Sequence, residues 1–105
     1  MRIQINTDGN IEGREELATR SRDVVRRSLS RYSDQITRVE VHLSDENSDK
    51  SGQRDKRCLI EARMEGRQPT AVTHEAATVD EAVEGAANKL KRALASSVGR
   101  LRDKR

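Results

Sequence analysis

The 105-residue sequence predicts an α+β domain with the element order βαβββα: a two-layer sandwich in which two helices pack on one face of a four-stranded sheet. Two observations lead to this fold. Four stretches alternate apolar and polar residues, the period of a strand with one buried face. Two longer stretches repeat apolar residues every three or four positions, the period of an amphipathic helix. One sheet covered by two helices buries all of these apolar faces together.

The strands are predicted at residues 1–7, 37–43, 57–65 and 70–76. The first ends at Asp8-Gly9-Asn10, which has the residue types of a turn. A helix between the first two strands permits a parallel pair with a right-handed crossover, and the last three strands should form an antiparallel meander. We expect the following residues of the second and third strands to face the core: Val39, Val41, Leu43, Cys58, Ile60, Ala62 and Met64.

The first helix is predicted at residues 14–30. Its outer surface is rich in arginine: one ridge carries Arg20, Arg27 and Arg31, and the opposite flank carries Arg22 and Arg26. We expect its inner side to contain Leu17, Ser21, Val24, Val25, Ser28 and Tyr32.

Two interpretations of these arginines remain open. In the first, the helix is solvated and its charges pair, Glu16 with Arg20 and Asp23 with Arg27, each pair contributing about 0.2–0.5 kcal/mol. In the second, the helix binds anions, because the planar guanidinium group suits phosphate.

The second helix is predicted at residues 78–105. Thr78 and Glu81 have the spacing of a capping box, in which the threonine hydroxyl accepts from the amide three residues later. The apolar stripe that should face the core comprises Val83, Ala87, Leu90, Leu94, Val98 and Leu101.

Positive charge is concentrated in this helix. Residues 88–105 contain seven cations and one anion, a net charge of 7 − 1 = +6, whereas the whole chain carries +3, so the remaining residues sum to −3. Such a concentration of charge creates a field that attracts anionic partners.

Length and composition predict a single domain, residues 1–105, with a mobile loop at about 45–56 and a mobile tail at about 102–105. The single Cys58 excludes an internal disulfide and suits a reducing compartment. No apolar run approaches the length of a membrane span or a signal peptide core, so we expect a cytoplasmic protein without a membrane partner.

The sequence offers no catalytic constellation, so we expect no enzyme, no metal, no cofactor and no small-molecule substrate. His42 and His74 lie on different predicted strands without further histidines nearby. Cys58 lies on the apolar side of its strand and has no visible base. Asp45, Glu46 and Asp49 lack the spacing of a calcium loop.

Nucleic-acid binding fits the sequence better. If the helices pack side by side, the ridge of Arg20, Arg27 and Arg31 lies near a second ridge, and a basic channel between them could follow a phosphate backbone. The second ridge comprises Lys89, Arg92 and Arg100. Because the chain has no Trp or Phe, we expect recognition of backbone and shape rather than base stacking.

Several local features resemble the ribosome hibernation-promoting factors, also called ribosome-associated inhibitors or sigma-factor modulation proteins. They are the first strand Met1–Ile5, Leu17 and Tyr32 around the first helix, the segment Ser33–Ile36, and the opening of the last helix at Glu81–Gly85. The most specific is Lys89–Leu94, which is similar to the Lys-Leu-x-Arg-x-Leu of family members. The sequence departs from the family at Thr78 and Asp80, where Asp-x-Tyr is usual.

The resemblance implies a βαβββα domain that binds the small ribosomal subunit, contacts ribosomal RNA where messenger and transfer RNA would pass, and blocks translation by occupancy. It assigns RNA contact to Lys89 and Arg92 and, less directly, to Lys91 and Arg100. A second hypothesis stays open, in which the same fold serves as a regulatory module for another RNA or for a protein. The sequence does not decide the oligomeric state, or whether ribosome dimers or single ribosomes are favoured.

Overall fold

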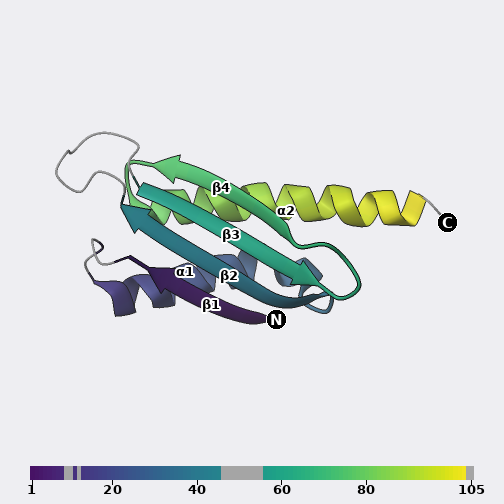
Figure 1. Cartoon of the computed structure of the whole chain (residues 1–105), viewed down its shortest axis with the longest axis horizontal. Helices are drawn as coiled ribbons and strands as arrows, with labels where there is room; N and C mark the ends of the chain where they lie inside the picture. Colours follow the sequence, from purple (N-terminus) through teal and green to yellow (C-terminus); the bar gives the residue numbers. More distant parts are fainter. Residues whose placement is uncertain (9–10, 12, 46–55, 104–105) are drawn as a thin grey trace.

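The computed structural model describes residues 1–8, 11, 13–45 and 56–103, with side chains up to residue 97. Figure 1 shows the predicted order βαβββα, with one additional 3-10 turn after the first helix. The elements are β1 (Arg2–Thr7), α1 (Arg14–Ser28), η1 (Ser30–Tyr32), β2 (Ile36–Asp45), β3 (Lys56–Met64), β4 (Thr70–Ala76) and α2 (Val79–Asp103).

The sheet has the strand order β1-β2-β3-β4, and the predicted pairing is confirmed. β1 runs parallel to β2 with Ile3 opposite Val39, whereas β3 is antiparallel to both of its neighbours. The alternation of apolar residues sets this register, because Val39, Val41 and Ile60 are fully buried on the same face.

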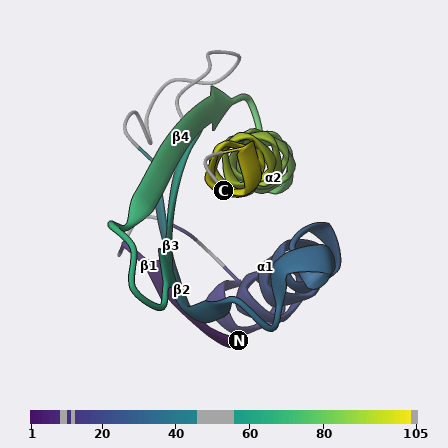
Figure 2. The ribbon, with the colours of Figure 1, turned by 90° about the vertical axis from the view of Figure 1, so that its right-hand side faces the viewer.

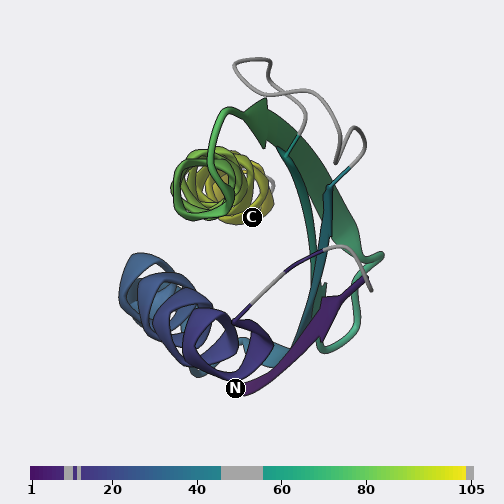
Figure 3. The ribbon, with the colours of Figure 1, turned by 90° about the vertical axis from the view of Figure 1, so that its left-hand side faces the viewer.

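Both helices cover that face of the sheet, and the other face is open (Figures 2 and 3). The first helix ends two residues earlier than predicted, because the backbone of Leu29 leaves the helical region at φ −105° and ψ 9°. The 3-10 turn that follows brings Tyr32 into the core. Of the predicted inner residues of α1, Leu17, Ser21 and Val25 are buried, while Val24 and Ser28 are half-buried.

The predicted start of α2 is confirmed. The Glu81 amide donates to the Thr78 hydroxyl at 3.1 Å, and that hydroxyl donates to the Glu81 carboxylate at 2.9 Å. Val83, Ala87, Leu90 and Leu94 are buried as predicted, and Val98 and Leu101 lie beyond the described side chains. Ala82 and Ala86 are also buried, so the apolar face of α2 is wider than the predicted stripe.

Gly85 allows α2 to approach β4 closely. A Cβ atom at this position would overlap with the imidazole of His74. The helix interior therefore accepts glycine despite its cost of about 0.5–1 kcal/mol relative to alanine.

The predicted loop at about 45–56 begins later and ends earlier than expected. Asp45 and Lys56 are paired strand residues, and their side chains form an ion pair of 3.2 Å between Nζ and Oδ2 that extends the β2–β3 ladder. Residues 46–55 lie outside the described part of the chain. Of the predicted tail, residues 102 and 103 belong to α2, and residues 104 and 105 lie outside the described part.

Candidate nucleic-acid interface

The ridge of α1 that carries Arg20 and Arg27 lies on the side of α2, whereas Arg31, the third residue of the predicted ridge, belongs to the 3-10 turn η1. Arg20 forms a two-pronged ion pair with Asp80 of α2, with Nε to Oδ1 at 3.3 Å and Nη2 to Oδ2 at 3.4 Å. Both side chains are more than half exposed, at 54% and 59%, so this pair contributes about 0.2–1 kcal/mol at most. The pair neutralises Arg20 and replaces the predicted contact with Glu16.

Arg27 and Arg31 have no carboxylate partner among the described residues. The Nε of Arg27 donates to the backbone carbonyl of Asp23 at 3.3 Å, not to its carboxylate as predicted. Arg31 is exposed in the 3-10 turn, and no side-chain partner is present among the described residues. The Ser30 hydroxyl donates to the Arg27 carbonyl at 3.1 Å and stabilises the end of α1, between these two arginines in the chain.

The side of α2 that faces α1 changes from negative to positive charge along the helix. Asp80, Glu84 and Asn88 follow one another at intervals of four, and Lys91 comes three residues later, so all four share one side of the helix. The ridge is therefore acidic at its start, neutral at Asn88 and cationic at Lys91. The basic part of the groove begins about halfway along α2.

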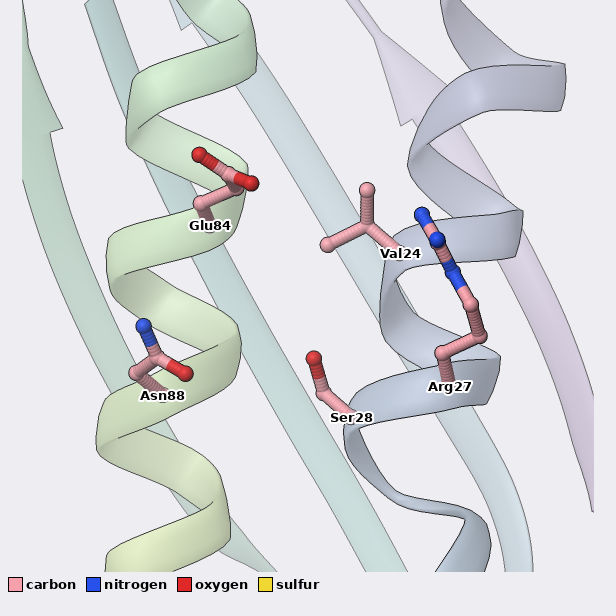
Figure 4. A pocket seen from close by; sticks show the side chains of 5 residues that line it. All are labelled: Val24, Arg27, Ser28, Glu84 and Asn88. Carbon is pink, nitrogen blue, oxygen red and sulfur yellow. The ribbon is translucent and has the colours of Figure 1, made fainter.

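A pocket of about 280 Å³ lies between the two helices at this transition. Figure 4 shows Glu84 and Asn88 on α2 opposite Val24 and Ser28 on α1, with Arg27 beside them. The lining is largely polar and contains one cation and one carboxylate. Such a surface suits hydrogen bonding to a polar ligand such as a sugar-phosphate backbone.

The predicted cations of α2 do not form a single ridge toward α1. The Nζ of Lys89 donates to the Thr73 carbonyl of β4 at 2.9 Å, which places Lys89 on the side of α2 away from α1. Arg92 and Lys91 are exposed, with Arg92 toward solvent between these two sides. The side chain of Arg100 lies beyond the described residues. The cations thus spread over the exposed half of the helix.

Arg22 and Arg26 lie on the far flank of α1, as predicted. Arg26 forms an ion pair of 3.6 Å with Asp23, the carboxylate that was expected to pair with Arg27. Arg22 lines a separate hollow beside β1, so it does not reach the groove between the helices.

The position of Asp80 and Glu84 beside α1 was not predicted from the sequence. Neither Asp80 nor Glu84 was assigned from the sequence to a surface shared with α1. The signal was present, since their spacing of four with Asn88 already placed them on one side of α2. The sequence did not reveal that this side faces α1.

The described residues contain no cluster of three or more His, Cys, Asp or Glu side chains that could hold a metal ion. Burial raises the pKa of the Cys58 thiol to about 12, so the thiolate that a nucleophile needs is absent at neutral pH. Within the same described ranges, no helix has the length and apolarity required to cross a membrane.

Solved structures share this fold. The N-terminal domain of Protein Y from Thermus thermophilus aligns with a TM-score of 0.69 and 22% identity over 88% of this chain and 93% of that domain. A ribosomal subunit interface protein from Coxiella burnetii aligns with a TM-score of 0.69 and 16% identity over 94% of this chain and 99% of that protein. No curated protein matches the sequence significantly.

The family described as sigma 54 modulation protein / S30EA ribosomal protein matches residues 3–102, which is nearly the whole chain. This match confirms the resemblance carried by the first strand and by the Lys89–Leu94 segment. The chain therefore belongs to this family of ribosome-associated modulation proteins.

Proposed function

We propose that this protein binds the small ribosomal subunit through ribosomal RNA and inhibits translation by occupying the path of messenger and transfer RNA. The mechanism involves no chemical step. It requires a surface that holds phosphates and a compact body that excludes other ligands. The proposal includes a cytoplasmic location, where ribosomes are found.

The observation that supports this proposal most strongly is the uncompensated charge of the helix layer. Arg27, Arg31, Lys91 and Arg92 are exposed, and none of them forms an ion pair with a carboxylate among the described residues. Cations without internal partners are available for phosphate oxygens. Lys89 is also exposed and can exchange its contact with the Thr73 carbonyl for a phosphate.

The location of these cations suits a folded RNA. Arg27 of α1 lines a polar groove between the helices, and Lys91 lies on the side of α2 that faces α1, so an RNA backbone could contact both helices at once. The described residues contribute no aromatic ring to the groove, and recognition would then depend on shape and phosphate spacing.

Co-sedimentation with purified small ribosomal subunits tests the proposal. If about 6–10 phosphates are contacted, affinity should fall by about 10³–10⁵ between low and moderate salt. Protein that remains in the supernatant at low salt would refute ribosome binding. Retention on a protein partner together with indifference to ribosomes would favour the regulatory-module hypothesis instead.

A further inference from the structure

The outer edge of β1 is an open edge of the sheet. Among the described strands β1 pairs with β2 alone. The Asp8 amide donates to the Leu43 carbonyl at 3.1 Å, and this bond shows which residues of β1 direct their backbone groups toward β2. The N–H and C=O groups of successive strand residues point alternately to the two sides of the strand. Gln4 is an even number of residues from Asp8, so its backbone groups also point toward β2. The N–H and C=O groups of Ile3 and Ile5 therefore point away from the sheet, and no backbone group of another described segment bonds to them.

Three arginines surround this edge at a hollow of about 550 Å³. Arg2 and Arg38 lie opposite each other on the parallel strands and on the open face of the sheet. Arg22 belongs to α1, which lies on the covered side of the sheet (Figure 3). The hollow is lined by Arg2, Ile3, Gln4, Ile5, Arg22 and Arg38.

Two of these three arginines lack a carboxylate partner among the described residues. Arg38 donates to Gln4 at 2.8 Å and pairs with Glu40 at 3.3 Å, whereas Arg2 and Arg22 have no side-chain partner in the described part of the chain. Like charges on opposite residues of neighbouring strands destabilise a sheet. Their convergence on one hollow therefore favours an anionic ligand.

We propose that the β1 edge binds an extended acidic segment of a partner protein by strand addition. A strand offers both donors and acceptors to the N–H and C=O groups of Ile3 and Ile5. A phosphate backbone could satisfy only the donors, and its oxygens would face the Ile3 and Ile5 carbonyls. A second copy of this chain would bring two sets of arginines together, which opposes pairing of its β1 edges.

The geometry also defines the sequence of the partner segment. Side chains of an added strand alternate between the two faces of the sheet. Acidic residues at alternate positions would meet Arg2 and Arg38 on the open face, and an acidic residue between them would meet Arg22 on the covered side.

The test is a titration of the isotope-labelled protein with a synthetic peptide of about six residues, a common strand length, that alternates Glu and Thr. We expect hydrogen exchange of the Ile3 and Ile5 amides to slow by at least about tenfold, because they gain hydrogen bonds. The Gln4 amide, which already belongs to the ladder, should change little.

Matched controls separate strand addition from other binding. Arg22→Gln should weaken the peptide by about tenfold or more, whereas Arg63→Gln, which removes the same charge from the β3 surface, should not. Methylating the peptide's backbone nitrogens should abolish binding without any change to the protein. The proposal is overturned if Ile3 and Ile5 stay unprotected, if a Lys-Thr peptide binds equally, or if an oligoribonucleotide or a second copy protects the same amides instead. Small-subunit binding plays no part in this outcome.

Discussion

The two outer surfaces of the molecule, the helix layer and the open face of the sheet, carry similar side chains but differ in how their charges are paired. On the sheet, Arg38 contacts Glu40 at 3.3 Å and Arg63 contacts Glu61 at 3.2 Å. On the helices Arg20 and Arg26 are paired as well, but Arg31 and Lys91 have no carboxylate partner among the described residues. Pairing, more than the number of cations, decides which surface attracts an anion.

Secondary structure explains this difference. In a strand, residues two apart lie on the same face, so the Arg-x-Glu and Glu-x-Arg patterns of β2 and β3 bring opposite charges together. On a helix the neighbours are three and four apart, and Arg22 and Arg26 at that spacing in α1 are both cations. The same period that buries one side of each helix thus gathers positive charge on the other.

The largest effect should come from weakening the packing of α2 against the sheet. Leu90→Ala should lower the free energy of unfolding by about 2–5 kcal/mol, because Leu90 is fully buried beneath α2. The neighbouring Lys91→Ala should change it by less than about 0.5 kcal/mol, since Lys91 is exposed. Urea denaturation of both variants measures the difference, and equal losses would show that the phase of α2 is wrong.

The next effect compares one cation from each surface. Arg31→Gln should weaken binding to purified small subunits by about tenfold or more, because a hydrogen bond to a charged group contributes about 1.5–3 kcal/mol. Arg63→Gln removes the same charge from the sheet and should leave the dissociation constant within about twofold. A filter-binding titration at constant salt measures both. Equal weakening by the two variants would mean that only net charge matters.

The pH dependence of stability with and without the Cys58 thiol tests whether the helices cover the inner face of the sheet. Its pKa is raised to about 12 from 9.0 by burial, so the folded protein keeps the thiol proton at pH values where the unfolded chain has lost it. This contribution to stability is fully present below about pH 9 and is lost as pH rises toward 12, by up to about 1.4 kcal/mol per pH unit. The stability of Cys58→Ala should fall less steeply over the same range, as measured by denaturation. Parallel slopes would indicate an exposed thiol.

The smallest effect should have the opposite sign. Glu84→Gln removes a carboxylate from the groove and should tighten small-subunit binding by about two- to fivefold, because a like charge near a phosphate costs on the order of 1 kcal/mol in water. Glu61→Gln on the sheet is the matched control, with no expected gain. Weaker binding of Glu84→Gln would mean that this carboxylate contacts the ligand directly.

Most of the fold could be predicted from the sequence because every element has a regular apolar period. The parallel pairing of β1 with β2, the inward residues of β3 and the Thr78 cap all followed from local patterns. The end of α1 at Leu29 did not, since the chain leaves the helix to bury both Leu29 and Tyr32, and such tertiary packing leaves no local signal.

The candidate site was less predictable, because it depends on how the two helices are rotated toward each other. Arg20 and Arg27 were correctly placed on one ridge, but the helix period alone did not show that Asp80 would reach Arg20 or that Lys89 would turn toward Thr73. Those contacts join residues that are distant in the sequence or lie on different elements. Whether the predicted cations bind RNA remains a prediction.

The central claim, that the helix layer and not the open sheet face contacts ribosomal RNA, can be tested most directly with a tethered iron chelate. A cysteine introduced at Asn88 or at Arg63 accepts the chelate, while the buried Cys58 remains unlabelled. Radicals from position 88 should cut the RNA of the small subunit, and radicals from position 63 should leave it intact. Cuts from position 63 with none from position 88 would contradict the account.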